Sequence, residues 1–219
     1  MDARAQILAA VSAANWNEVR QRVNASPALA AIRDDAGVSL TMMLAYRGAN
    51  ELASLVASHL APDVFEATTL GDTARLEQIL AATPEAVNSQ SADGWTALHL
   101  AGFFGQVEAA KLLLAHGASV SAYGNNYMRN LPLHAALSGA QNQALVSLLL
   151  EHGANANAAG ATGITPLHLA ASRGNQALID LLLAKGADKS SKMDNGQQPA
   201  DLAREHGHPA MAQALAQTG

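Results

Sequence analysis

The sequence predicts an all-α solenoid of about seven stacked helix pairs. Three observations support this fold class. A short motif recurs at intervals of 33 to 35 residues, and glycines recur in pairs that are 11 residues apart. In addition, 49% of the residues are hydrophobic but only 4% are aromatic, because alanine and leucine supply most of the apolar content and favour helices. A short helix pair cannot bury its apolar face alone, so such units stack on one another.

The recurring motif is built around a histidine. It reads Thr-Ala-Leu-His-Leu-Ala at 96–101, Leu-Pro-Leu-His-Ala-Ala at 131–136, Thr-Pro-Leu-His-Leu-Ala at 165–170 and, in decayed form, Gln-Pro-Ala-Asp-Leu-Ala at 198–203. Threonine is a good N-cap and proline a good first helical residue, so the motif predicts the start of a helix. A triple leucine follows at 112–114, 148–150 and 181–183, each with a glycine soon after it. These elements predict a second helix and its end.

The N-terminal part of the chain shows the same layout in a weaker form. Gly37 and Gly48 have the 11-residue spacing that also separates Gly94 from Gly105. They predict a divergent repeat over roughly residues 34–60, in which Met42 takes the histidine position. Two further helix pairs are expected within residues 9–30 and 66–88, the latter without the turn motif.

With these motifs the sequence resembles the ankyrin-repeat family, whose signature combines a 33-residue period with a Thr-Pro-Leu-His core. The resemblance implies a single domain over residues 1–219. Its parts would be a divergent N-terminal cap at 1–33, divergent repeats at 34–92, three near-consensus repeats at 93–192 and a C-terminal cap repeat at 193–219. It also implies a concave surface, formed by the turns and first helices, that binds another protein.

Composition argues against several other classes of protein. The formal net charge is −5, whereas a nucleic-acid binder needs a concentrated basic face. The absence of cysteine excludes disulfides and thiolate metal sites. No phosphate loop, metal-binding H-E-x-x-H or nucleophile-elbow motif occurs, so we expect no enzyme activity and no cofactor. No run approaches 18 apolar residues, so we expect a cytoplasmic protein without a membrane partner. We also expect a monomer.

The histidines at the motif position have a structural interpretation. His99, His134 and His168 occupy one position in successive repeats, which lie about 10 Å apart. Side chains at that separation cannot share a zinc ion, whose ligand bonds are about 2 Å long. The resemblance implies instead that each ring braces its turn by hydrogen bonds to backbone and threonine. We therefore expect no metal site.

Aromatic residues mark the candidate binding surface. Five of the eight in the chain fall between residues 95 and 127, at positions that ankyrin proteins use for contacts. The loop at 123–130 carries about two extra residues and is expected to form a longer finger. The predicted partner-binding residues are Tyr46, Arg47, Trp95, Phe103, Phe104, Tyr123, Tyr127, Met128 and Arg173.

Two interpretations of these rings remain open at this stage. Exposed aromatic residues on a concave face are typical of an interaction hot spot. Alternatively, the rings fill a gap beside Gly102, or pack under the long finger. The leading functional hypothesis is a non-catalytic module that binds a partner protein. The alternative is a small-molecule or metal-binding protein that uses the same concavity.

Overall fold

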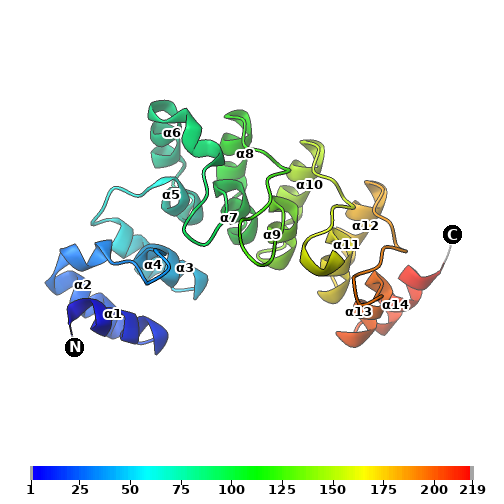
Figure 1. Cartoon of the computed structure of the whole chain (residues 1–219), viewed down its shortest axis with the longest axis horizontal. Coiled ribbons are helices and arrows are strands. Elements are labelled where there is room, and N and C mark those ends of the chain that lie inside the picture. Colours follow the sequence, from blue (N-terminus) through cyan, green and yellow to red (C-terminus); the bar gives the residue numbers. More distant parts are fainter. Residues whose placement is uncertain (1, 218–219) are drawn as a thin grey trace.

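The computed structural model describes residues 2–217, which form fourteen α-helices in seven consecutive pairs. The pairs stack in one curved row between the two termini (Figure 1). The helices are α1 (Ala3–Ser12), α2 (Trp16–Ala25), α3 (Leu40–Tyr46), α4 (Asn50–Ala57), α5 (Val64–Leu70), α6 (Thr73–Ala82), α7 (Ala97–Phe104), α8 (Val107–Ala115), α9 (Pro132–Ser138), α10 (Gln143–Glu151), α11 (Pro166–Ser172), α12 (Gln176–Ala184), α13 (Pro199–Glu205) and α14 (Pro209–Ala216). Three 3-10 helices, η1 (Pro27–Ala31), η2 (Pro84–Asn88) and η3 (Ala161–Gly163), complete the helical structure. The predicted all-α solenoid is confirmed.

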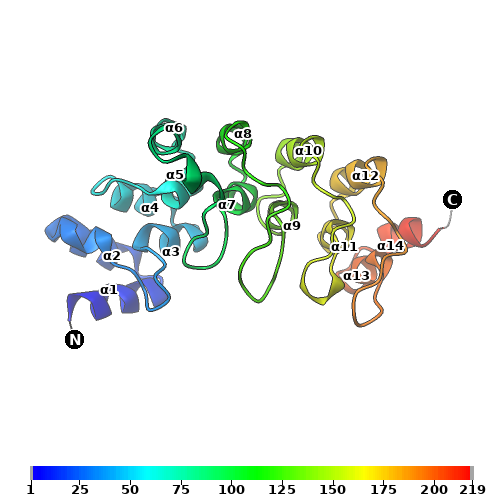
Figure 2. The ribbon, with the colours of Figure 1, turned by 45° about the horizontal axis from the view of Figure 1, so that its top comes forward.

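The helices form two layers. The second helices α6, α8, α10 and α12 make an outer row, and α5, α7, α9 and α11 lie beneath them (Figure 2). The loops that precede most first helices extend away from the outer row, and we call these loops fingers. Among the described residues, β-structure is limited to two isolated bridges at the bases of fingers, Arg33–Ser39 and Gln90–Thr96.

Helix α11 shows how the motif determines a helix. Thr165 is the N-cap in an extended conformation, and Pro166 is the first helical residue, where its missing N–H leaves no bond unmade. After the helix, Gly174 adopts a φ of 67°, which only glycine takes without strain. The same left-handed conformation occurs at every glycine of the 11-residue pairs, namely Gly37, Gly48, Gly94, Gly105, Gly163, Gly174, Gly196 and Gly207. The glycine spacing therefore located the turns correctly, including those of the divergent repeat.

The core runs along the length of the solenoid. The middle residue of each triple leucine, Leu113, Leu149 or Leu182, is 0% exposed. One apolar cluster extends from Val64 to Leu215, and a second occupies the first two helix pairs. A third, smaller cluster lies between them and contains most of the aromatic rings.

Each finger is closed at its base by one backbone hydrogen bond. In four fingers the N–H donates to the carbonyl four residues later, in the pairs Asp34–Val38, Ser91–Trp95, Gly160–Ile164 and Met193–Gln197. In the finger of residues 123–130 the bond joins Gly124 to Asn130 at 2.8 Å and so spans six residues. The predicted two-residue extension is confirmed, and we call residues 123–130 the long finger.

The long finger is held on both sides. The N–H of Asn125 donates to the carbonyl of Gly94 in the preceding finger at 2.8 Å. On the other side, the N–H of Ala161 donates to the carbonyl of Met128 at 3.0 Å. Because backbone bonds tie the finger to both neighbours, its side chains are presented from a fixed support.

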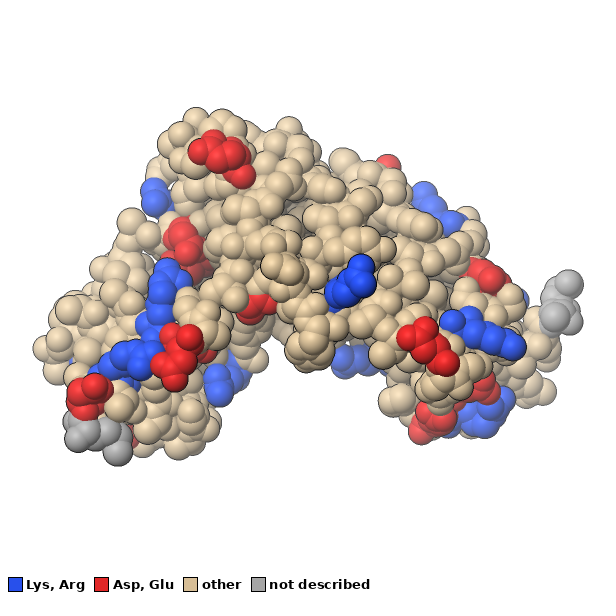
Figure 3. Space-filling model, in the orientation of Figure 1, with Lys and Arg blue, Asp and Glu red and all other residues tan. Residues whose placement is uncertain are grey.

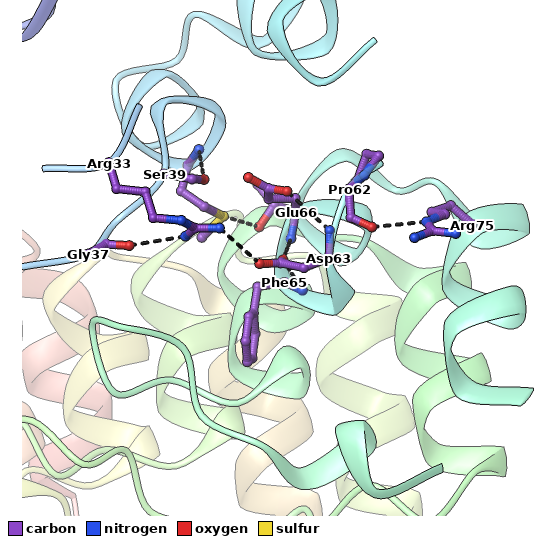
Figure 4. Close-up of polar contacts among 10 residues, drawn as sticks. Arg33, Gly37, Ser39, Pro62, Asp63, Phe65, Glu66 and Arg75 are labelled. Atoms are coloured by element: carbon purple, nitrogen blue, oxygen red, sulfur yellow. Dashed lines mark hydrogen bonds and ion pairs between the residues drawn. The ribbon is translucent and has the colours of Figure 1, made fainter. Parts of the chain in front are cut away.

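No finger separates α4 from α5, as the missing turn motif predicts. A short segment ends at Asp63, whose carboxylate accepts from the Glu66 N–H at 2.9 Å, while the Asp63 N–H donates to the Glu66 carboxylate at 3.1 Å (Figure 4). Arg33 from the preceding finger lies 3.6 Å from the Asp63 carboxylate. The finger tips on either side approach each other here, since a Cβ on Gly37 would lie 3.3 Å from the Cβ of Ala92.

Candidate functional site

Four aromatic rings pack together on the inner face between the second and fourth repeats. We call Tyr46, Trp95, Phe103 and Phe104 the aromatic cluster. The Tyr46 ring lies 6.3 Å from the Trp95 ring and 6.0 Å from the Phe103 ring, both edge to face, and Trp95 lies 5.3 Å from Phe103. Tyr46 ends α3, whereas the two phenylalanines end α7, so these contacts reach across the intervening repeat that contains α5. Edge-to-face and tilted pairs at such distances add stability beyond the area they bury.

The structure separates the two interpretations of the rings. The indole of Trp95 is only 6% exposed, because Phe103, Tyr46 and His99 pack around it. An exposed hot-spot role for the whole ring is therefore wrong. Phe103, Phe104 and Tyr46 are half-buried and keep part of their surface on the inner face.

The proposed gap beside Gly102 does not exist. A Cβ at Gly102 would lie 2.9 Å from the carbonyl oxygen of Pro132 and 3.1 Å from the backbone nitrogen of Ala136. The absence of a side chain thus allows α9 to approach α7 closely, and no ring fills that space.

A carboxylate lies beside the aromatic cluster. The Tyr46 hydroxyl donates to one oxygen of Asp93, and the Ser91 hydroxyl donates to the other. Burial and then the neighbouring Asp93 carboxylate raise the pKa of Tyr46, so the phenol stays protonated as a donor. In the part of the chain that the structure describes, the ion pairs involve other carboxylates, and none neutralises Asp93.

The long finger carries the large exposed apolar side chains. Tyr127 is 87% exposed, Tyr123 47% and Met128 36%. The Asn126 side chain donates to the carbonyl of Asp93 at 3.0 Å, which fixes the finger beside the aromatic cluster. The guanidinium of Arg129 lies 5.8 Å from the centre of the Tyr123 ring, a cation–π contact on the far side of the finger.

Together these elements form an open concavity, which we call the central recess. Its walls are mainly aromatic and apolar, with one carboxylate. The lining residues are Tyr46, Asp93, Trp95, Phe103, Asn126, Tyr127 and Met128. Most of the charged side chains in Figure 3 lie toward the two ends of the arc, and its middle shows only a few, including isolated Lys or Arg side chains.

Four predicted site residues do not line the central recess, namely Arg47, Phe104, Tyr123 and Arg173. Arg47 follows α3 and is exposed. Arg173 follows α11 and is also exposed, but its guanidinium donates to the carbonyl of Ser138 in the preceding repeat at 2.6 Å. Arg173 therefore has a structural contact that links two repeats, independent of any contact with a partner. Asp93 and Asn126, which line the recess, were not among the predicted site residues.

The histidine column links successive repeats. In His99, Nδ1 accepts from the Thr96 backbone N–H at 3.3 Å, and Nε2 lies 3.1 Å from the carbonyl of Asn130 in the next finger. Since Nδ1 accepts, the proton resides on Nε2, which donates to the carbonyl. His168 repeats this arrangement with Thr165 and Gln197, and His134 with Leu131 and Ile164. The predicted hydrogen bonds to the backbone are confirmed for all three rings, and those to threonine for His99 and His168, whereas His134 has Leu131 at that position.

Replacing His134 by alanine is expected to lower the free energy of unfolding by about 1–3 kcal/mol, because a buried interrepeat hydrogen bond is lost. His134 is almost fully buried, whereas His59 is exposed and provides the matched control, His59→Ala. Urea denaturation followed by circular dichroism measures both variants. Equal stability of His134→Ala and His59→Ala would contradict the bracing role.

The described residues contain no group of three histidine, aspartate or glutamate side chains placed to hold a metal ion. Within residues 2–217, no helix has the length and apolar character needed to cross a bilayer.

A family model described as "Ankyrin repeats (3 copies)" matches residues 64–160 and 133–219, which together exceed half of the chain. The chain belongs to the ankyrin-repeat family. A segment of 82 residues is 43% identical to the B-cell lymphoma 3 protein homolog of Mus musculus. A segment of the same length is 35% identical to the serine/threonine-protein kinase VIK of Arabidopsis thaliana. Each segment covers 37% of this ankyrin chain and only 18% of the relative.

Ankyrin repeats are in general protein-interaction modules. Since this chain matches less than a fifth of the length of either relative, the similarity concerns the repeats and does not extend to the rest of those proteins.

Proposed function

We propose that this ankyrin protein binds a partner protein through its inner face, without catalysis, and that the central recess and the long finger form the centre of contact. The observation that carries this proposal is the exposure of Tyr127 and Met128 beside a largely apolar recess. Large exposed apolar side chains that adjoin a concavity are typical of interaction sites.

The rigidity of the site supports the same function. The long finger is bonded to both neighbouring fingers, and the half-buried rings of Phe103 and Tyr46 are held by their neighbours. Side chains that are already ordered lose little conformational entropy on binding, so more of the contact energy appears as affinity. Tyr123, Phe104, Arg47 and Arg173 would then contact the partner around this centre, where polar and charged groups are common.

Truncating Tyr127 to alanine is expected to weaken binding of the partner roughly tenfold or more, as for a hot-spot residue, with the melting temperature unchanged. The ring is 87% exposed, so its loss removes little folding energy. The partner is captured from the native cell with the immobilised wild-type chain and identified by mass spectrometry, and its affinity for each variant is then measured by calorimetry.

The control variant is Lys111→Ala, on the exposed part of the outer helix α8. If Tyr127→Ala binds as tightly as Lys111→Ala, the inner face is not the binding surface. Phe103 is less suitable for this test because it also packs against Trp95, so its truncation would change stability and binding together.

A further inference from the structure

We propose that the central recess takes up a lysine side chain of the partner protein, whose ammonium group lies between the aromatic rings and the carboxylate of Asp93. This inference rests on the proposed function and specifies the chemistry of its partner. It follows from three features of the recess: the arrangement of its rings, an unneutralised carboxylate, and the way that carboxylate is already hydrogen-bonded.

The rings provide several π faces at steep angles to one another. Among the lining rings, Tyr46 and Phe103 keep exposed surface and are inclined by 68° to one another, whereas Trp95 is only 6% exposed and packs against both. Tyr127 adds a fourth ring from the long finger. A cation within about 6 Å of an aromatic face is attracted by the ring quadrupole, and Trp and Tyr give the strongest attraction. Rings that meet at such angles form a corner, which suits a compact cation.

The carboxylate of Asp93 gives the recess a negative charge, and no ion pair among residues 2–217 balances it. Asp93 is half-buried at the tip of the turn, and its oxygens accept from the hydroxyls of Tyr46 and Ser91. Hydroxyl donors hold a carboxylate in place but leave its charge intact. A charge in a partly desolvated apolar site interacts more strongly with an incoming opposite charge than it would in water. An uncharged apolar side chain would leave this carboxylate desolvated and unpaired, at a cost in affinity.

The hydrogen bonds of Asp93 favour lysine over arginine. Guanidinium binds carboxylates best through two parallel hydrogen bonds to both oxygens. In this site each carboxylate oxygen already accepts one hydrogen bond from a hydroxyl group. The guanidinium group of an arginine would therefore compete with Tyr46 and Ser91. Ammonium is a compact charge with three rotatable donors and needs only one free position on the carboxylate.

The test uses small amides that each represent one side chain of a peptide. N-acetyl-lysine methylamide carries the ammonium group, the norleucine amide has the same carbon chain without it, and the arginine amide carries a guanidinium. Ionic strength is matched with sodium chloride in every titration. The chain has two tryptophans, Trp16 in α2 and Trp95 in the recess, so a Trp16→Phe background makes Trp95 the single fluorescence reporter.

The lysine amide is expected to change the Trp95 emission saturably, with a dissociation constant on the order of millimolar, and at least about fivefold more tightly than the norleucine or arginine amide. Asp93→Asn should remove this preference, while thermal melting reports whether the variant is folded. Tyr127→Ala, whose ring is 87% exposed, should weaken lysine binding about threefold or more without a change in melting. Lys111→Ala changes an exposed side chain of the outer helix α8 and should leave binding unchanged.

Equal binding of the lysine and norleucine amides would overturn the proposal, since the recess would then be an apolar site. Tighter binding of the arginine amide, or no saturable change with any amide, would overturn it as well. The proposed function is tested separately: if a captured partner depends on Tyr127 but the lysine amide does not bind, the inner face binds protein without a lysine in the recess. If the amide binds but no partner depends on Tyr127, the proposed protein-binding function fails.

Discussion

Replacing Leu149 by alanine is expected to lower the free energy of unfolding by about 2–5 kcal/mol, from lost transfer energy and the cavity left behind. Leu149 is 0% exposed in α10, which packs between α8 and α12. Interior side chains are close-packed, and hydrogen bonds of the fingers and histidines also join neighbouring repeats. The helices around Leu149 therefore have little freedom to move into the cavity.

Urea denaturation followed by circular dichroism gives this change in stability. The adjacent residue Leu148 is only half-buried, so Leu148→Ala provides a control in the same helix with a smaller expected loss. A loss below about 0.5 kcal/mol for Leu149→Ala would mean that the face of α10 that carries Leu149 does not pack into the core.

Acidification is expected to destabilise the fold between pH 6.5 and pH 4. Burial lowers the pKa of His99 to about 4, and it also lowers the pKa of His134 and of His168. A histidine with a folded pKa below its unfolded value of about 6.5 contributes its full stability above pH 6.5. As the pH falls toward 4, the histidine is protonated in the unfolded chain but stays neutral in the folded chain, so the free energy of unfolding decreases. For His99 alone this difference corresponds to roughly 3 kcal/mol.

Denaturation at a series of pH values measures this effect. The contribution of the histidines can be told from that of Asp188 and Asp201 because the two act in different pH ranges. The pKa values of Asp188 and Asp201 are lowered from 3.8 by hydrogen bonds, so any stability they confer is lost only at still lower pH. His99→Gln removes one titrating ring and should flatten the dependence between pH 6.5 and 4. A wild-type stability that stays constant across this window would contradict the buried neutral histidines.

The sequence predicted the fold well because its signals are local. A glycine that must adopt a positive φ, a threonine that caps a helix and the middle leucine of a triplet each act within a few residues of their position, as Gly174, Thr165 and Leu149 show. The extended finger could be predicted for the same reason, since two extra residues within a fixed period must be accommodated in the loop.

The candidate site was predicted only in part because its geometry depends on distant residues. The contact of Tyr46 with Phe103 joins two helices separated by a whole repeat, and no local pattern reports the curvature that brings them together. The same curvature buries Trp95 and places Asp93 against Tyr46. The aromatic residues of the sequence therefore indicated where rings would gather but could not distinguish rings that pack inward from those that remain exposed.

The contact between the second and fourth repeats changes how this solenoid should respond to force and heat. A solenoid in which each repeat contacts only its neighbours behaves as a one-dimensional array that can lose repeats one by one from either end. Here Tyr46 is in ring contact with Phe104, at 5.4 Å, and with Phe103, so three consecutive repeats are coupled by an interaction that skips one position. Unravelling from the N-terminus would therefore pause at the second repeat, because its release requires breaking contacts with the fourth as well as the third.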